Sequence, residues 1–316
     1  MNLQYKRIVG AVCVFVAVAF FLATTLFVRS RSWGEKRPTV LGPGPLNRTN
    51  VSPGTPVKPG TELRILPLGD SITQGWLSDE DGGDGNGYRL QLRQDLSEDE
   101  VVFAGTEVRG SMYDAWFAAW PGKTIQYISE NVPDSLKQRP NLILLHAGTN
   151  DMDDRPDRGK QGNEPKAAAE RLGNLIDQLI EACPDAVILV AVIIGTCDPH
   201  KSPGTPEYQS LIPATVQTRR DEGHRVLAVD FSTFPEDQLR DCIHPTNDGY
   251  KELGHYWYDF ITQIPANWIG HPVGDDPARA ESTAEGAKMR PSRLMGLVGL
   301  PAILGLVLWT QRVVTE

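Results

Sequence analysis

Short, unbroken runs of apolar residues recur five times in the middle of the chain. They begin at Leu63, Val101, Asn141, Ala186 and Arg225 ("LRILPL", "VVFAG", "NLILLHAG", "AVILVAVII" and "RVLAVD") and are rich in Val, Ile and Leu. Continuous apolar runs, as opposed to alternating ones, are typical of strands buried on both faces of a parallel sheet. The pattern therefore predicts five buried strands.

Between these runs, apolar residues recur at a helical period. The clearest cases are residues 167–184 ("AAAERLGNLIDQLIEACP") and 247–261 ("NDGYKELGHYWYDFI"), and weaker patterns cover 88–96, 123–130 and 207–222. Residues spaced in this way form one apolar helix face. Strands that alternate with helices predict a doubly wound α/β sheet, in which ligands bind beyond the carboxyl ends of the strands.

Two further apolar segments lie near the ends of the chain. Ile8 to Val28 carries no charge over 21 residues, which gives about 30 Å of helix, the thickness of a bilayer core. We interpret residues 1–30 as an uncleaved transmembrane signal anchor, with secretion after signal cleavage as the alternative. Residues 294–310 are a weaker candidate, for a second span or for a lipid-anchor signal. The expected location is a membrane of the secretory pathway or the cell surface, with the folded domain lumenal or extracellular.

The remaining segments frame one domain. Residues 31–60 are rich in Pro, Gly, Ser and Thr and predict a flexible stalk, followed by a folded domain at 61–265 and a linker at 266–293. The stalk contains acceptor tripeptides for N-glycosylation at Asn47 and Asn50. These tripeptides are usable only in the secretory lumen.

Composition narrows the class of protein further. The chain has 316 residues, 40% of them hydrophobic, which is enough for one ample core, and its net charge of -9 argues against nucleic acid as a partner. Cys197 and Cys242 are expected at the same end of the sheet and are able to form a disulfide in an oxidising lumen. Free, buried thiols at these positions and at Cys183 are the alternative.

Polar residues follow four of the predicted strands. "GDSIT" ends the first, "WPGKT" follows the second, "GTND" ends the third and "DCIHP" follows the fifth. A serine hydrolase needs a nucleophile, an imidazole base, a carboxylate that orients this base, and donors for the oxyanion. The polar residues of these four blocks supply all of these groups, which predicts nucleophilic catalysis at the carboxyl edge of the sheet.

Each role has a candidate residue. Ser71 begins a helix and is the candidate nucleophile, while Asp241 and His244, three residues apart in one loop, are the candidate acid and base. The backbone N–H groups of Ser71 and Gly122 and the side-chain amide of Asn150 are the candidate oxyanion donors. Two other acids have a structural interpretation. Asp70 is too close to Ser71 in sequence to stand behind the imidazole, and Asp151 suits a turn.

The four ordered blocks resemble the SGNH hydrolase superfamily, also called GDSL-type esterases. Within it, "ILPLGDSIT", "GYR", "LLHAGTNDM" and "IHPTNDGY" are most similar to carbohydrate esterase family 3, the acetyl xylan esterase type. The resemblance covers residues 61–265 and implies a flavodoxin-like three-layer α/β/α sandwich with a five-stranded parallel sheet. It implies the same roles for Ser71, Gly122, Asn150, Asp241 and His244. The chain departs from these esterases at Trp120, where His or Tyr often precedes Pro-Gly.

These observations predict a serine esterase that removes acetyl or other small acyl groups, with acylated carbohydrate as the expected substrate. The reaction proceeds through an acyl-enzyme and requires no metal or organic cofactor. A lipid esterase that acts at the membrane is the first alternative. A carbohydrate-binding protein that retains the fold without activity is the second. A "GxSxG" elbow is absent from the sequence, which argues against the α/β-hydrolase fold.

Overall fold

The computed structural model describes residues 42–278. In this part of the chain, one sheet has the strand order β3-β4-β1-β5-β6-β7, and β2 also pairs with β1. All strand pairs are parallel except β3 with β4. The strands are β1 (Leu63–Gly69), β2 (Val101–Phe103), β3 (Glu107–Val108), β4 (Trp116–Ala119), β5 (Leu142–His146), β6 (Val187–Val192) and β7 (Val226–Asp230).

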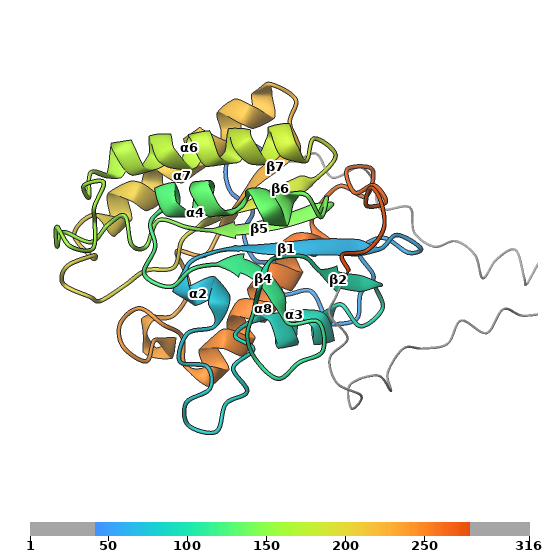
Figure 1. Cartoon of the computed structure of the whole chain (residues 1–316), viewed down its shortest axis with the longest axis horizontal. Coiled ribbons are helices and arrows are strands. Elements are labelled where there is room, and N and C mark those ends of the chain that lie inside the picture. The colour runs from blue at the N-terminus through green and yellow to red at the C-terminus, as the bar shows by residue number, and fades with distance from the viewer. Residues whose placement is uncertain (1–41, 279–316) are drawn as a thin grey trace, which may run out of the picture. The chain divides into compact units, whose positions relative to one another are not determined.

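Helices cover both faces of this sheet (Figure 1). α4, α6 and α7 lie on one face, and α2, α3 and α8 lie on the other. The helices are α2 (Ser71–Gln74), α3 (Arg89–Asp95), α4 (Ile125–Asn131), α5 (Pro133–Leu136), α6 (Pro165–Ala182), α7 (Thr205–Asp221) and α8 (Asn247–Thr262), with a short 3-10 helix, η1, at Glu236–Gln238. The predicted three-layer α/β/α fold is therefore confirmed.

The two faces of β1 show why the apolar runs are unbroken. Leu66 and Leu68 pack into the core beneath α4 and α6, whereas Leu63 and Ile65 pack into the core beneath α3 and α8. Successive strand residues point to opposite faces, so a strand covered on both sides needs apolar residues at every position.

The sheet has seven strands in the described residues, not the five expected. The five predicted strands are all present, and β3 and β4 are additional. β2 pairs only with Leu63–Ile65, at the start of β1, while Leu68 and Gly69 are in register with Ala118 and Ala119 of β4. β4 thus completes the pairing of β1 at its carboxyl end, and the "WPGKT" block follows β4 instead of β2.

The sequence predicts a flexible stalk at residues 31–60. The part of this segment that the structure describes, from residue 42, packs against the domain. The N–H of Leu46 donates to the Ala228 carbonyl at 2.8 Å, and the N–H of Asp230 donates to the Leu46 carbonyl at 2.9 Å, which covers the outer edge of β7. Asp259, 1% exposed, accepts hydrogen bonds from the N–H groups of Thr49 (2.7 Å) and Val51 (2.8 Å). A buried carboxylate needs such donors, which gives this segment a fixed place.

The domain also extends beyond the expected end at residue 265. The guanidinium of Arg64, which is 2% exposed, donates to the carbonyls of Val273 (3.0 Å) and Gly274 (3.2 Å) and to Asp276 (2.9 Å). The physical reason is the same as for Asp259, because a buried charge requires partners. The described folded unit therefore reaches from Leu46 to Asp276.

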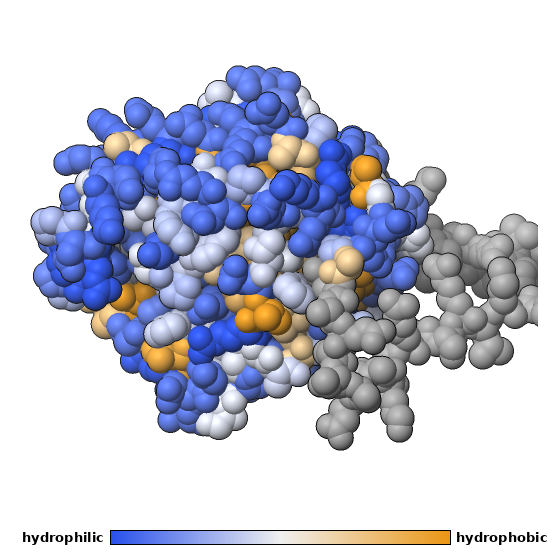
Figure 2. All heavy atoms as spheres, in the orientation of Figure 1, coloured by the Kyte–Doolittle hydropathy of each residue, from blue (hydrophilic) through white to orange (hydrophobic). Residues whose placement is uncertain are grey.

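The predicted membrane segments, 1–30 and 294–310, lie outside the described residues. Within residues 42–278, none of the helices combines the length and the apolar character that crossing a bilayer requires. Hydrophilic residues dominate the visible face of the domain, and hydrophobic residues appear there only in small groups (Figure 2). Asn47 and Asn50 of the two glycosylation tripeptides are both exposed.

Candidate active site

The candidate nucleophile lies where β1 gives way to α2. β1 ends at Gly69, and Ser71 is the first residue of α2. A Cβ atom on Gly69 would lie 2.2 Å from the carbonyl oxygen of His146, so glycine is needed where β1 and β5 approach each other. Asp70 is the N-cap of α2, because its Oδ1 accepts the N–H of Ile72 at 3.1 Å. Ser71 is thereby held at the carboxyl edge of the sheet and is 6% exposed.

The structure brings Ser71, His244 and Asp241 together across 173 residues of sequence. Nε2 of His244 lies 2.8 Å from Oγ of Ser71, and Nδ1 of His244 lies 2.8 Å from Oδ2 of Asp241. Both distances are those of hydrogen bonds. With the ring proton on Nδ1 donated to Asp241, Nε2 is free to accept the proton of the Ser71 hydroxyl.

The second oxygen of Asp241 fixes the backbone of its own loop. Oδ1 accepts the N–H of His244 at 2.7 Å and the N–H of Ile243 at 3.1 Å. Partial burial by itself would raise the pKa of Asp241, but the hydrogen bonds from the backbone and ring of His244 outweigh this effect, and the pKa lies below its ordinary value. Asp241 is therefore a charged carboxylate under mildly acidic and neutral conditions.

A disulfide joins this loop to the loop that follows β6. Cys197 and Cys242 are bonded, and Cys242 lies between Asp241 and His244 in sequence. The carbonyl of Cys242 also accepts the Thr196 hydroxyl at 2.7 Å and the Cys197 N–H at 3.3 Å. Cys242 has a φ of +67°, an unfavourable value for a residue with a side chain. These bonds hold the loop in that conformation.

Two candidate oxyanion donors follow β4 and β5, the strands on either side of the end of β1. The N–H of Trp120 donates to the Gly69 carbonyl at 3.2 Å, which places the following Gly122 beyond the carboxyl end of β1. Gly122 has a φ of +70° and open space where a Cβ would lie. Glycine suits this position because of its backbone conformation.

Asn150 lies in the loop after β5 and contacts residues that follow β1 and β4. Its Nδ2 donates to the carbonyl of Lys123 at 3.0 Å and to Oδ2 of Asp70 at 3.4 Å. The second separation is long for an N–H···O bond. The contact between Asp70 and Asn150 was not predicted from the sequence. The only signal for it was that Asp70 and the loop of Asn150 follow adjacent strands.

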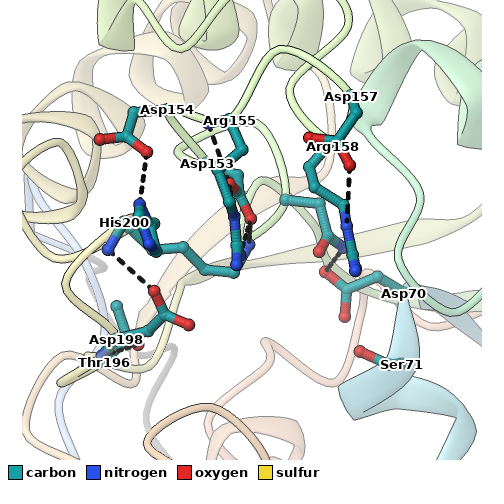
Figure 3. A network of polar contacts seen from close by, with 12 residues as sticks. Asp70, Ser71, Asp153, Asp154, Arg155, Asp157, Arg158, Thr196, Asp198 and His200 are labelled. Atoms are coloured by element: carbon teal, nitrogen blue, oxygen red, sulfur yellow. Dashed lines mark hydrogen bonds and ion pairs between the residues drawn. The ribbon is translucent and has the colours of Figure 1, made fainter.

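Asp70, the neighbour of the nucleophile in sequence, has a strongly raised pKa. Complete burial raises its pKa to about 7, although the Ile72 N–H and the charge of Lys201 act in the opposite direction. Lys201 itself is 4% exposed and forms an ion pair with Asp153. Figure 3 shows Asp70 with Ser71, and the group around Asp153 on the loops that follow β5 and β6.

This polar group ties the two loops together. Asp153 accepts hydrogen bonds from Lys201 and Arg155, and Asp154 accepts one from His200 at 2.8 Å (Figure 3). Burial alone would raise the pKa of Asp153, but the donors from Arg155 and Lys201 hold it well below its ordinary value. The loop that carries Asn150 is therefore anchored on the side opposite Ser71.

Asp151, which has a structural interpretation in the sequence, and the buried His146 both have structural contacts. Asp151 is fully buried and accepts the N–H of Ile125 at 2.9 Å and the guanidinium of Arg171. His146 lies in the core, where its Nε2 accepts the N–H of Ile194 at 3.2 Å. Within residues 42–278, no group of three or more His, Cys, Asp and Glu side chains is arranged to hold a metal ion.

Comparisons with known proteins bear on the family and on the fold. The sequence model of the GDSL-like lipase/acylhydrolase family matches residues 68–252. Among curated proteins, a multidomain esterase of Ruminococcus flavefaciens is 26% identical over an alignment of 231 residues, and the match covers 63% of this chain and 28% of the esterase. The chain thus spans less than a third of the length of that relative.

Solved structures share the fold. A family 3 carbohydrate esterase from Clostridium thermocellum aligns with a TM-score of 0.55 and 26% identity, covering 66% of this chain and all of that one. A family 3 carbohydrate esterase from Talaromyces cellulolyticus aligns with a TM-score of 0.52 and 19% identity, over 66% of this chain and 99% of that one. At 19% identity the second similarity concerns the fold alone.

Proposed function

The chain belongs to the GDSL-like lipase/acylhydrolase family and is an ester-hydrolysing enzyme; from this premise we propose that Ser71, His244 and Asp241 form its catalytic triad. The observation that carries the proposal is the continuous hydrogen-bonded series from Ser71 Oγ through His244 to Asp241, with 2.8 Å at both steps. Because a serine hydroxyl is a weak nucleophile at neutral pH, it needs an adjacent base of this kind.

In the proposed reaction, Ser71 Oγ attacks the carbonyl carbon of the ester while its proton passes to Nε2 of His244. The negative charge that develops on the carbonyl oxygen is stabilised by the N–H groups of Ser71 and Gly122 and by Nδ2 of Asn150. When the tetrahedral intermediate collapses, the C–O bond to the alcohol breaks, and His244 returns the proton to the departing alkoxide. The acyl group remains bonded to Ser71.

Water completes the cycle by the same route. The oxygen of a water molecule attacks the acyl carbon while His244 takes a proton from this water. The bond between the acyl carbon and Ser71 Oγ then breaks. The proton returns to Ser71, and the free carboxylic acid is released. Asp241 keeps its charge throughout and stabilises the imidazolium that forms in each half of the reaction.

For the substrate, we propose an acetylated or similarly acylated carbohydrate. The basis is similarity, since the relative aligned at 26% identity over its whole length is named a family 3 carbohydrate esterase. A long-chain lipid ester is the competing substrate. Hydrolysis rates on a series of esters with acyl chains of 2 to about 12 carbons distinguish the two, because a carbohydrate deacylase of this type favours the shortest chains. A preference for the longest chains would exclude the carbohydrate substrate.

The central test is chemical labelling of the nucleophile. The wild-type protein should react with a fluorophosphonate probe at Ser71 and hydrolyse small acyl esters, whereas Ser71→Ala should do neither. Ser135→Ala is a matched control, since Ser135 is also a buried serine but lies in α5, where its hydroxyl is hydrogen-bonded to that of Thr106. Undiminished activity in Ser71→Ala would overturn the assignment. Failure of the wild type to label, together with carbohydrate binding, would support the non-catalytic alternative.

We also propose that the enzyme works in an oxidising compartment or outside the cell. The disulfide next to the acid and the base supports this location, because such bonds persist in secretory and extracellular environments. The exposed tripeptides at Asn47 and Asn50 agree with it. Glycosidase treatment of the protein expressed in a eukaryotic host, followed by mass analysis, tests the use of these two asparagines.

A further inference from the structure

A cavity of about 480 Å³ lies between α3, α8 and the loop that follows α2. Loop residues 78–87 form one wall, Leu90, Gln91 and Gln94 of α3 form a second, and Asn247 and Lys251 of α8 contribute to a third. This volume is within the range of pockets that take small organic ligands. The Gly- and Asp-rich loop "DEDGGDGNG" (residues 79–87) thus borders a cavity.

The cavity is connected to the loop that carries the acid and the base. Arg240, the residue before Asp241, forms an ion pair with Asp81 in the cavity wall. Asn247, three residues after His244, donates from Nδ2 to the Glu80 carbonyl at 2.9 Å. Two contacts therefore link the loop that carries Asp241 and His244 to the wall of the cavity.

Two of the three carboxylates in the lining are paired with a cation. Asp81 is paired with Arg240, and Asp248 is paired with Lys251 at 2.8 Å. Asp84 accepts the N–H of Asn86 at 2.8 Å and keeps its negative charge. The two ion pairs leave little attraction for a further cation, and the charge of Asp84 disfavours an anion, so the lining favours a neutral ligand.

The uncharged lining residues indicate what kind of neutral ligand fits. The exposed amide of Gln94 offers both a donor and an acceptor, as neighbouring hydroxyl groups of a sugar do. Gln91 and Asn247 offer mainly their amide oxygens, because Nε2 of Gln91 donates to Asp95 at 2.9 Å and Nδ2 of Asn247 donates to the Glu80 carbonyl. Leu90 is half-buried and adds an apolar surface to the same wall. Together these groups match a sugar ring, which carries hydroxyl groups at its edge and C–H groups on its face.

The walls are fixed before a ligand arrives. The Ser78 hydroxyl donates to the Gly75 carbonyl at 2.7 Å and accepts the N–H of Gly87 at 3.0 Å, which closes the loop on itself. The Tyr250 hydroxyl donates to the Trp76 carbonyl at 2.8 Å and holds the loop against α8. A preformed site avoids the entropic cost of ordering a loop on binding.

We propose that this cavity is a subsite for a neutral sugar unit of the substrate, at a distance from the ester that reacts at Ser71. The inference rests on the proposed function and adds to it the position at which the carbohydrate chain is recognised. A subsite of this kind raises the affinity for oligosaccharides and leaves small esters unaffected.

Steady-state kinetics on two substrates test the subsite. Gln94→Ala removes an exposed amide, and Gln94→Trp places a large ring at the cavity. Both variants should raise KM for an acetylated oligosaccharide, by about 5-fold for the loss of one hydrogen bond and more for the ring. The kcat/KM for p-nitrophenyl acetate should stay within about 2-fold of wild type. Gln217→Ala and Gln217→Trp on α7, on the opposite face of the sheet, are the matched controls.

Direct binding provides a second measurement. Ser71→Ala protein is titrated with the unacetylated oligosaccharides xylohexaose and cellohexaose, with and without Gln94→Trp. Loss of binding in the Gln94→Trp background, and not in the Gln217→Trp background, supports the subsite. The subsite would be excluded if all variants had the same KM for the oligosaccharide. It would also be excluded if the Gln94 variants lost kcat/KM equally on the oligosaccharide and on p-nitrophenyl acetate. A wild-type protein that leaves p-nitrophenyl acetate intact would instead overturn the proposed function.

Discussion

Asp70 and Asn150, 80 residues apart, meet at the carboxyl edge of the sheet through a contact of 3.4 Å between Oδ2 and Nδ2. The other oxygen of Asp70 caps α2 through the N–H of Ile72. One buried carboxylate thus contacts both the helix that begins with the nucleophile and the amide proposed to stabilise the oxyanion. Its position accounts for the polar Asp-Ser pair at the end of a buried strand.

Replacement of Asp70 should therefore impair catalysis through Asn150. Loss of a direct oxyanion donor costs about 10²- to 10³-fold in kcat, so Asn150→Ala should fall in this range. Asp70→Ala should lower kcat by a smaller factor, roughly 10- to 100-fold, with KM little changed. Asp70→Asn keeps an acceptor for the Ile72 N–H and should retain more activity than Asp70→Ala. Steady-state kinetics on a small acyl ester give these values.

A double-mutant cycle separates this effect from a loss of folding. If Asp70 acts by positioning Asn150, the double variant should be little worse than Asn150→Ala alone, since the two residues are coupled. Fully multiplicative losses would contradict this mechanism. Circular dichroism and fluorophosphonate labelling of Ser71 report whether each variant is folded.

The dependence of activity on pH follows from the charge of Asp241. Because hydrogen bonds from His244 lower the pKa of Asp241, this carboxylate keeps its charge in mild acid. Asp241 should therefore add no limb of its own in mild acid to a plot of log kcat/KM against pH. In Asp70→Asn, which lacks the carboxyl group whose pKa burial raises to about 7, the acid limb should have a slope of no more than one. A steeper limb in this variant would contradict the charged state of Asp241.

Removal of the Asp241 carboxylate should have a large effect on turnover. In Asp241→Asn the ring loses its charged partner and takes the wrong tautomer, which costs about 10⁴-fold in serine proteases. We expect a loss of 10³- to 10⁴-fold in kcat with the fold unchanged. Asp248→Asn, an exposed acid on the first turn of α8, is a suitable control. A loss below about 10-fold in Asp241→Asn would argue against a triad.

The disulfide should matter for activity as well as for stability. The double variant Cys197→Ala/Cys242→Ala, which lacks the disulfide, should have a free energy of unfolding that is lower by about 2–4 kcal/mol. It should also lower kcat, because Cys242 lies between the acid and the base and has a strained backbone. Chemical denaturation and kinetics at a temperature where the variant is folded measure the two effects. Unchanged kcat would limit the disulfide to a structural role.

The stability of the fold should depend on His146 in acid. Complete burial lowers the pKa of His146 from its ordinary value of 6.5 to about 4, so the folded protein holds the neutral ring. Its contribution to stability is complete above pH 6.5 and is lost as the pH falls toward 4, because the unfolded chain then binds the additional proton. Asp70 has a raised pKa, so its protonation favours the folded state as the pH falls over part of this range.

For this reason the test compares variants. In His146→Gln the stability should decline less between pH 6.5 and pH 4 than in the wild type, as measured by urea unfolding. The same substitution at the exposed His271 is the control. Parallel declines in the wild type and in His146→Gln would contradict the assignment.

The local pattern of the sequence was sufficient for the strands and helices that form the core. β1, β5, β6 and β7 are apolar at successive positions because both faces of each are covered, and this regularity is visible without a structure. β4 was missed although it lies in an unbroken apolar run, "AWFAAW" at residues 115–120, because this run is short and lacks the Val, Ile and Leu that mark the other strands. Its place is set by the end of β1 that β2 leaves unpaired. The segment from Leu46 to Val51 was also missed, since its Pro- and Gly-rich composition says nothing about the buried Asp259 that binds it.

The sequence by itself determined which chemical groups the candidate site contains. Ser71, Asn150 and the Asp241/His244 pair each follow a recognisable strand, and parallel strands bring their carboxyl ends to one edge. Only the tertiary structure decided how these groups meet. The 2.8 Å contact of Ser71 with His244, the contact of Asp70 with Asn150 and the φ of Gly122 depend on strand register and loop anchoring. These arise from contacts between residues distant in sequence, which no local pattern encodes.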